Sequence, residues 1–473
     1  MTVAAQAAKI VIQLVSVVTL ARLLAPGDFG LIAMLAVFFA IADLLRDFGI
    51  STAALQARSL SEQQASNLFW INTALGTVLG GVLLAGAPLI AGFYGEPRLT
   101  GIAPAMSAVL VLNGLQTQIQ IRLARAMRFF TLAVTDVGAQ ILALAVAVIA
   151  ALNGLGYWAL VMQTATGATS LLIMRALAAR WGPGRFRDFA GTRELAVSGG
   201  HLGTAQLLSY AASNVDTVAI GAGLGAAELG LYNRAFQLVM APVTQMLGPL
   251  THVIIPVGTR ATSRGVRLDT VLLRAQVVLA LPAIGALAMA ATVGPRAIPW
   301  LLGAQWSATA GIFAVLSIAA AFTVLSTVSY WAFLLELKSK ELLRYNLVTK
   351  SMTVALVVAA AQFSTLAVAW AYTVALALSW PINLIWLWRT TPLQPRRYLQ
   401  NGALLLTAGA LAWAAGHTVS GLMAGAGPLG AAAVAGLTTL AAYLLLIAAT
   451  RPGRRALAEV WQVSRQGLRR NTR

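Results

Sequence analysis

The chain has 473 residues, of which 59% are hydrophobic and only 10% are charged, and its mean hydropathy is +0.79. A soluble domain carries about 25% charged residues, so a chain this poor in charge is predicted to expose most of its surface to lipid. The net charge of +19 does not indicate nucleic acid, because the cations lie in short segments between apolar runs and form no patch interleaved with aromatics. The lack of cysteine excludes disulfides, thiolate nucleophiles and metal sites with cysteine ligands.

Apolar runs long enough to cross a bilayer follow one another along the chain. A helix needs about 20 residues to cross about 30 Å of hydrocarbon. Such runs predict fourteen transmembrane helices, at 3–24, 29–55, 67–93, 99–120, 132–152, 155–178, 198–223, 230–257, 271–293, 308–333, 343–361, 364–388, 401–419 and 427–449. Only α-helices satisfy the backbone of such segments in lipid, so we expect an all-α integral membrane protein. The first run contains Lys9 and Gln13 and lacks a signal-peptide cleavage site, so we read it as the first helix.

Basic residues are distributed unequally between the two sides of these helices. Most of the 33 Lys and Arg lie in the even-numbered connections and in the C-terminal tail, whereas the opposite connections contain only Arg98 and Arg296. Positive residues stay on the cytoplasmic side, which predicts an inner-membrane protein with both termini in the cytoplasm. The tail alternates arginines with apolar residues, which predicts either a basic amphipathic helix on the inner leaflet or a disordered segment.

The sequence contains an internal repeat. A shift of 200 places Asp28, Gly30 and Leu31 on Glu228, Gly230 and Leu231, and a shift of 210 places Asn113, Gln116, Thr117, Gln120 and Arg128 on Thr323, Ser326, Thr327, Tyr330 and Lys338. We predict a six-helix bundle at 1–180, a cytoplasmic linker at 181–197, a second six-helix bundle at 198–390, two further helices at 391–450 and a basic cytoplasmic tail at 451–473. Both halves start inside, so the repeat is parallel, and such transporters place the substrate path between their halves.

Polar side chains form a stripe on one face of the first helix and on its repeat partner. The stripes are Gln6, Lys9, Gln13 and Ser16, and Gln206, Ser209, Ser213 and Asp216. Their spacing of three and four residues puts each set on one helix face. We interpret Lys9, Gln13, Gln206 and Ser213 as substrate-binding residues, because polar groups in hydrocarbon face a partner or a watery cavity. The alternatives are interhelical hydrogen bonding for the stripes and snorkelling for Lys9.

Charged groups on three other helices are further candidates. On the second helix, Arg46 can pair with Asp43 or Asp47, which predicts an ion pair or gate, with proton or cation coupling as the alternative. Asp216 is a third candidate for ion coupling or gating. Arg46 also counts as a substrate-binding residue, as do Arg234 and Gln237 on the eighth helix, where an exposed interfacial arginine is the alternative for Arg234. Asp136 is interpreted as a carboxylate at the start of the fifth helix.

Motifs for chemistry are absent from the sequence. There is no P-loop, no Asp-x-Asp, no His-Glu-x-x-His and no Gly-x-Ser-x-Gly. His201, His252 and His417 are scattered, so we expect no metal site, no cofactor and no catalytic residues. A membrane glycosyltransferase or polymerase would need a substantial outer loop with a catalytic carboxylate, and none is present in the sequence. A transporter is therefore favoured over an enzyme.

Short motifs resemble one family along nearly the whole chain. These are Ala21-Arg-Leu-Leu-Ala-Pro-Gly-Asp-Phe-Gly-Leu-Ile-Ala, Asp47-Phe-Gly-Ile-Ser-Thr-Ala-Ala-Leu-Gln, Phe93-Tyr-Gly-Glu-Pro and Gly230-Leu-Tyr-Asn-Arg-Ala. In this order they resemble the bacterial polysaccharide flippases, the Wzx or polysaccharide-transporter branch of the MOP superfamily.

The resemblance implies a V-shaped pair of six-helix bundles with a central cleft that alternates access across the membrane. The implied substrate is an undecaprenyl-pyrophosphate-linked oligosaccharide repeat unit, which moves from the cytoplasmic to the periplasmic leaflet. A cationic cavity is implied too, with Lys9, Arg22, Arg46 and Arg234 as candidates. Implied partners are membrane lipids and the polymerase and export proteins of a polysaccharide. A peptidoglycan-precursor flippase and a multidrug–cation antiporter of the same superfamily are the alternatives.

Overall fold

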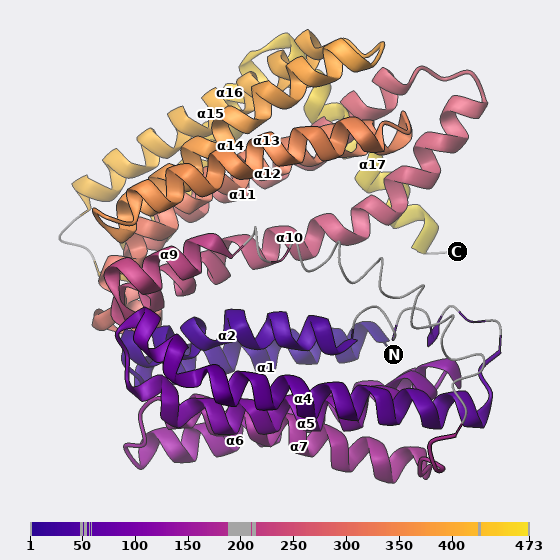
Figure 1. Cartoon of the computed structure of the whole chain (residues 1–473). Helices are drawn as coiled ribbons and strands as arrows, with labels where there is room; N and C mark the ends of the chain where they lie inside the picture. Colours follow the sequence, from indigo (N-terminus) through magenta and orange to yellow (C-terminus); the bar gives the residue numbers. More distant parts are fainter. Residues whose placement is uncertain are drawn as a thin grey trace. The chain divides into compact units, whose positions relative to one another are not determined.

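The described part of the chain consists of α-helices joined by short connections (Figure 1). The structure is a computed structural model, and it describes residues 2–47, 51, 54–55, 57, 59–187, 210, 214–423 and 427–471, with side chains from 8 to 462. The helices are α1 (Thr2–Leu23), α2 (Pro26–Asp47), α4 (Glu62–Tyr94), α5 (Arg98–Arg125), α6 (Phe129–Leu152), α7 (Trp158–Ala179), α9 (Val215–Leu224), α10 (Ala226–Ser263), α11 (Leu268–Leu302), η1 (Ala304–Trp306), α12 (Ser307–Leu335), α13 (Ser339–Ala360), α14 (Thr365–Thr390), α15 (Pro395–Leu422), α16 (Pro428–Ala449) and α17 (Arg451–Asn471).

Twelve of the described helices are long and apolar enough to cross a membrane. They are α2, α4 to α7 and α10 to α16, and they confirm the predicted all-α, multi-pass membrane class. Two predicted spans are not among the twelve. One is α1, and the other is the run at 198–223, of which α9 is the main described part. The count of fourteen therefore stays a prediction.

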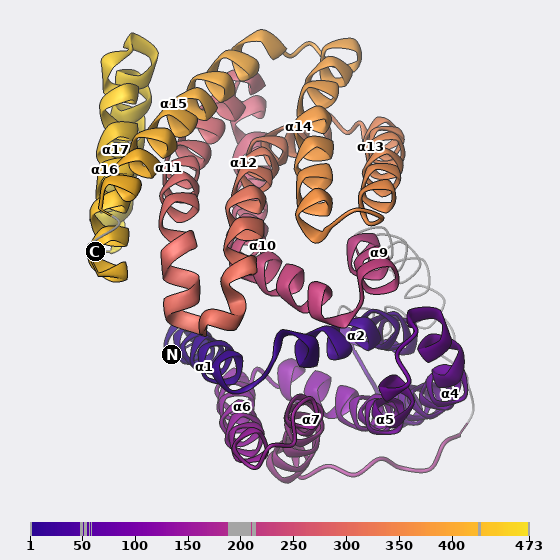
Figure 2. The same cartoon turned by 90° about the vertical axis from the view of Figure 1, so that its left-hand side faces the viewer.

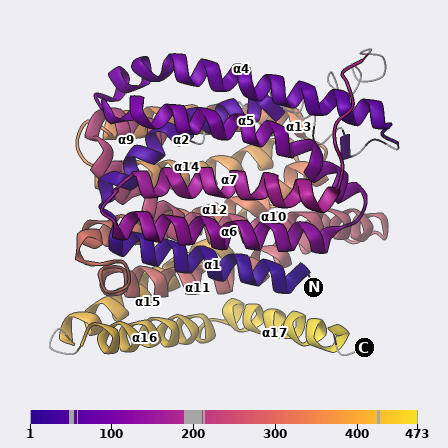
Figure 3. The same cartoon turned by 90° about the horizontal axis from the view of Figure 1, so that it is seen from below.

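The helices group into two compact units, Met1–Gly230 and Leu231–Arg473. Within the first unit, α4, α5, α7, α6 and α1 pack side by side in that order (Figure 3). The helix α2 packs against α4 and α5, and α9 packs against α2 and α4. The predicted linker at 181–197 lies largely outside the described residues, so the division into bundles at that point stays a prediction.

The second unit repeats the neighbour order of the first. The helices α11, α12, α14 and α13 pack side by side in that order, as α4, α5, α7 and α6 do in the first unit (Figure 2). Added to this core are α15 and α16, which both pack against α11, and α17, which packs against α16 and α11. The core contains large buried side chains, among them Trp331, Phe333 and Tyr443.

One turn has the same backbone conformation in both units. Met127 and Leu337, which are 210 residues apart, both have φ of 56°, the left-handed region that few residues with a Cβ adopt. In the first turn Arg128 N–H donates to the carbonyl of Leu123 at 3.0 Å, and in the second Lys338 N–H donates to that of Phe333 at 2.9 Å. The repeat inferred from polar residues is therefore present in the backbone.

Glycines let two pairs of segments in the first unit approach closely. A Cβ on Gly76 or Gly80 of α4 would lie 2.7 or 2.9 Å from a backbone carbonyl oxygen of α5. A Cβ on Gly30 would collide with the carbonyl of Ala226, and one on Gly230 would collide with that of Pro26. Small residues at such crossings allow helix backbones to touch in a membrane protein. Within the first unit, the start of α2 thus lies directly against the backbone of residues 226–230.

Candidate functional site

A carboxylate within the first unit holds two cations. Asp136 lies seven residues after Phe129, the first residue of α6, and so about two turns inside that helix. One of its carboxylate oxygens accepts a hydrogen bond from Nζ of Lys9 on α1, and the other accepts from Nη2 of Arg175 on α7 at 2.6 Å. The prediction that Asp136 starts its helix is wrong. Instead, this carboxylate joins α6 to two neighbouring helices.

Arg175 is the most enclosed member of this ion cluster. Its side chain is 5% exposed, whereas those of Lys9 and Asp136 are 27% and 23% exposed. Nη1 of Arg175 donates to the amide oxygens of Gln116 and Gln120 on α5, each at 2.9 Å. Within the described residues its Nε has no hydrogen-bond partner. Arg175 is therefore fixed by its neighbours, and Lys9 is the cation of the cluster that a ligand reaches more easily.

A second cation lies at the end of α2. The side chain of Arg46 is 6% exposed. Its Nε donates to Oδ1 of Asp43 at 3.0 Å, and its Nη1 donates to Oγ1 of Thr117 on α5 at 2.8 Å. The predicted pairing of Arg46 with Asp43 is thus present, whereas Asp47 accepts from the hydroxyl of Ser51. Arg46 has a role in joining α2 to α5, whatever else it does.

Hydrogen bonds connect these two charged groups. The amide of Asn113 donates to Oδ1 of Asp43 at 3.2 Å, and the amide of Gln116 donates to Oδ1 of Asn113, also at 3.2 Å. Because Gln116 also accepts from Arg175, one continuous chain of polar contacts runs from α1 to α2. We name this chain the inner polar network; its members are Lys9, Asp43, Arg46, Asn113, Gln116, Thr117, Gln120, Asp136 and Arg175.

The inner polar network carries an excess of positive charge. It contains three cations and two carboxylates, and five different helices contribute to it. Ionisable groups among membrane-spanning helices are costly, and they mark substrate or ion pathways. An excess cation in a medium of low dielectric attracts an anion more strongly than the same group does in water. The network can therefore hold the anionic part of a ligand through its most exposed cation, Lys9.

The polar stripe of α1 makes different contacts at each residue. Ser16 accepts a hydrogen bond from Nε2 of Gln163 on α7 at 2.9 Å, which matches the interhelical alternative. Gln13 is exposed. Of the partner stripe, Gln206 and Ser213 lie outside the described residues, whereas Asp216 is buried in the first turn of α9 and accepts from the backbone N–H of Thr217 at 2.9 Å.

The second unit contains the predicted pair on α10. Arg234 is buried, and its guanidinium carbon lies 5.5 Å from the centre of the Trp306 ring. The alternative of an exposed interfacial arginine is therefore wrong. Gln237 is exposed, and its amide oxygen lies 3.4 Å from Nη1 of Arg234. The stacking on Trp306 and the weak hydrogen bond to Gln237 contribute to holding Arg234 in place.

The inner polar network includes two charged residues whose roles the sequence analysis missed. From the sequence alone, Asp136 is interpreted as a helix start and Arg175 is not singled out. Both lie inside apolar runs that were correctly predicted to be helices. Opposite charges inside two consecutive spans are the signal that could have identified them, because such groups pair with one another in a membrane. The described residues contain no cluster of three or more His, Asp or Glu that could hold a metal ion.

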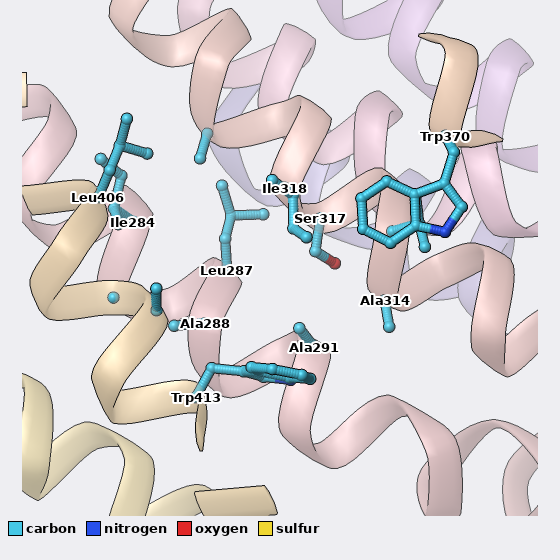
Figure 4. A pocket seen from close by; sticks show the side chains of 14 residues that line it. Ile284, Leu287, Ala288, Ala291, Ala314, Ser317, Ile318, Trp370, Leu406 and Trp413 are labelled. Carbon is cyan, nitrogen blue, oxygen red and sulfur yellow. The ribbon is translucent and has the colours of Figure 1, made fainter. Parts of the chain in front are cut away.

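An apolar cavity is present in the second unit (Figure 4). It lies between α11, α12, α14 and α15 and has a volume of about 310 Å³. Its lining includes Leu287, Ile318 and Leu406, and the indole rings of Trp370 and Trp413 lie on two sides of it. The hydroxyl of Ser317, also in the lining, already hydrogen-bonds to the carbonyl of Phe313 at 2.8 Å. The cavity therefore suits a hydrocarbon chain rather than a polar ligand.

Proteins that act in polysaccharide synthesis are similar to this chain in sequence. The teichuronic acid biosynthesis protein TuaB of Bacillus subtilis is 26% identical over 289 residues, which are 60% of this chain and 59% of TuaB. The lipopolysaccharide biosynthesis protein WzxC of Escherichia coli is 23% identical over 316 residues, 64% of this chain and 62% of WzxC. The succinoglycan biosynthesis transport protein ExoT of Rhizobium meliloti is 26% identical over 63% of this chain and 60% of ExoT. The chain thus matches about three fifths of the length of these relatives.

Solved structures show the same fold. The lipid II flippase MurJ, in an inward closed conformation, superposes with a TM-score of 0.72 over 94% of this chain and 98% of MurJ, at 11% identity. A multidrug resistance MATE family transporter of the MOP superfamily superposes with a TM-score of 0.59 over 79% of this chain and 93% of that transporter, at 14% identity. The family described as Polysaccharide biosynthesis protein matches residues 19–311. The resemblance inferred from the motifs is thereby confirmed, and the chain belongs to this polysaccharide biosynthesis family.

Proposed function

We propose that the chain is a flippase for an undecaprenyl-pyrophosphate-linked oligosaccharide. It resides in the inner membrane with both termini in the cytoplasm, and it moves the sugar head group to the periplasmic leaflet. The supporting relatives are named for the biosynthesis or transport of polysaccharides. A polar sugar does not cross hydrocarbon unaided, whereas the lipid chain can stay in the bilayer during transfer.

The observation that carries this proposal is the inner polar network. A lipid-linked oligosaccharide brings a pyrophosphate, and the network offers three cations against two carboxylates. A cationic drug would meet a net positive group at this place, which disfavours an antiporter. The apolar cavity of the second unit supplies a surface suited to the isoprenoid chain.

We assign different roles to the cations. Lys9, the more exposed, contacts the pyrophosphate as a point charge when the anion displaces Asp136. Arg175 is a positioning residue, because Gln116 and Gln120 hold it against Asp136. In the absence of substrate, Asp136 thus forms an ion pair with Lys9. When substrate binds, its pyrophosphate replaces Asp136 as the partner of Lys9. Asp43, Asp47 and Asp216 remain candidates for ion coupling or gating.

The driving force must come from outside the chain, because the sequence contains no P-loop. The membrane potential supplies about 2.3 kcal/mol per charge per 100 mV. Removal of the flipped product by polymerisation would supply the remaining free energy for transport. Polymerase and export proteins are therefore the expected functional partners, and no cofactor is required.

Flipping in proteoliposomes tests the function. A labelled undecaprenyl-pyrophosphate oligosaccharide is followed from leaflet to leaflet with the wild-type chain, with Lys9→Ala and with Arg98→Gln. Arg98 is a matched control, since it is a cation paired with Glu96 at 3.0 Å and lies outside the network. We expect the wild-type chain to move the labelled lipid. Lys9→Ala should slow this movement by about tenfold or more, because it removes a charge-assisted contact. Arg98→Gln should leave the rate unchanged.

Other outcomes distinguish the alternatives. Movement that Lys9→Ala leaves intact would keep the function and assign the anion to another cation, such as Arg46 or Arg234. Transport of a peptidoglycan precursor but of no other glycan would favour the precursor flippase. Transport of a drug or cation with no lipid movement would refute the flippase proposal.

Orientation has its own test, because the chain has no cysteine. Met127→Cys and Leu155→Cys place single thiols at exposed positions in connections on opposite sides of α6. We expect an impermeant thiol reagent added to intact spheroplasts to label Leu155→Cys and not Met127→Cys. The reverse pattern would place the termini in the periplasm.

A further inference from the structure

A basic cavity in the second unit is separate from the apolar cavity and has no role in the proposed transport step. It lies between α11, α15 and α17 and has a volume of about 560 Å³. Figure 3 shows α17 continuing beyond the end of α16, from which Thr450 separates it. The predicted basic helix at the C-terminus is thus present, and one face of it closes this cavity.

The rim of the cavity is strongly cationic. Four arginines line it, namely Arg274, Arg397, Arg451 and Arg455. The lining contains one carboxylate, Glu459, whose Oε1 lies 3.8 Å from Nε of Arg274. Within the described part of the chain, the side chains of the other three arginines make no hydrogen bond or ion pair. The cavity therefore has a net charge of about +3 and three guanidinium groups available to a ligand.

The floor of the cavity is apolar. Leu273 and Val277 of α11 and Leu404 and Leu405 of α15 form it. Leu404 is seven residues from Arg397 along α15, which puts it about 10 Å further toward the middle of the helix. The arginines of α15 and α17 lie near the first residue of α15 and just past the last residue of α16. Charge is thus at the level of the helix ends, and hydrocarbon-like surface is at the level of the spans.

We propose that this cavity binds an anionic phospholipid. Its phosphate contacts Arg397, Arg451 and Arg455, and an acyl chain lies over the leucines of the floor. Guanidinium groups hold phosphates through paired, charge-assisted hydrogen bonds, and basic pockets between membrane helices bind acidic head groups. Inorganic phosphate has the right charge but leaves the floor uncovered, and a neutral phospholipid covers the floor but leaves the arginines unbalanced. Only an anionic lipid satisfies both parts.

Binding to the purified full-length chain tests this proposal without any transport assay. Native mass spectrometry in detergent follows the addition of phosphatidylglycerol, phosphatidylethanolamine or inorganic phosphate. The site variant is the triple replacement Arg397→Gln, Arg451→Gln and Arg455→Gln. The matched control removes three exposed arginines of the same unit that do not line the cavity, by Arg260→Gln, Arg264→Gln and Arg389→Gln.

We expect the wild-type chain to bind phosphatidylglycerol in preference to the two other probes. The site variant should bind it about tenfold more weakly or worse, and the control should retain binding. Leu404→Trp keeps every arginine but obstructs the floor, so it should also weaken binding. This variant tests the cavity even if the triple variant does not fold.

Three results would overturn the proposal. Equal loss of binding in the site variant and the control would mean that only the overall charge attracts lipid. Equal binding of inorganic phosphate would mean that the cavity is a simple anion site. Undiminished binding by Leu404→Trp would mean that the lipid lies elsewhere. Each of these results is independent of whether the chain flips an oligosaccharide.

Discussion

Asp136→Asn is the sharpest test of the inner polar network. The substitution keeps the shape of the side chain but leaves Lys9 and Arg175 without their shared carboxylate. It also places an amide N–H₂ where both neighbours are donors. Loss of one partner from a fully buried ion pair costs about 3–5 kcal/mol. Since Asp136 is 23% exposed, we expect a smaller cost of about 2–3 kcal/mol.

Thermal unfolding of the purified chain measures this cost. A change of about 2–3 kcal/mol in a unit of this size lowers the Tm by about 5–10 °C. Glu62→Gln is the control, because Glu62 pairs with Arg122 at 2.6 Å but is 68% exposed. Exposed pairs contribute about 0–1 kcal/mol, so the control should change the Tm little.

A second substitution isolates the electrostatic part of the stability cost of Asp136→Asn. Lys9→Gln in the Asp136→Asn background removes the cation that the carboxylate used to neutralise. We expect the double variant to lose less stability than the sum of the two single variants, by about 1 kcal/mol or more. If Asp136→Asn proves as stable as Glu62→Gln, or if the two single effects simply add, the reasoning about a shared carboxylate is refuted.

Two further predictions concern glycine. Gly80→Ala should destabilise the chain by about 1–3 kcal/mol, because the added Cβ would lie 2.9 Å from the carbonyl oxygen of Ser107. Gly81→Ala is the control: its added Cβ would have nothing within 4 Å, so it should stabilise the helix by about 0.5–1 kcal/mol. Equal Tm values for these two variants would contradict the close packing of α4 and α5. Leu337→Gly should raise the Tm, because a residue with a Cβ in the left-handed conformation costs about 1–2 kcal/mol and glycine avoids this cost. Leu343→Gly should lower the Tm, because glycine is a poor helix former inside α13. A loss of stability in both would show that the turn needs its leucine.

The sequence was sufficient to predict most of the helices. Apolar run length dictates where a membrane helix lies, and the predicted runs coincide with the described helices within a few residues at most ends. Two helices continue well beyond their predicted ends, α10 to Ser263 instead of 257 and α11 to Leu302 instead of 293, whereas α2 ends at Asp47, before the predicted 55. The extension of α10 contains polar residues, so hydropathy does not detect it, although the backbone continues the helix.

The candidate site was predicted only in part, and the reason is physical. The spacing of Asp43 and Arg46 on one helix is a local property, so their pairing could be predicted from sequence. The pairing of Lys9 with Asp136 joins residues far apart in the chain, and it depends on which helices are neighbours. Hydrophobic periodicity does not specify this order, because apolar helices in lipid can pack in many orders. The order α1, α6, α7, α5 is what assembles the inner polar network.

The paired turns at Met127 and Leu337 have a consequence for the history of the two halves. Because their hydrogen bonds coincide at a separation of 210 residues, the helices that follow them can be compared position by position. Asn346 then stands where the first half has Asp136. An ancestral duplication would have started with identical copies, so the carboxylate has since become a property of one copy alone. The two halves thus differ in charge at this position even though their backbones still follow the same plan.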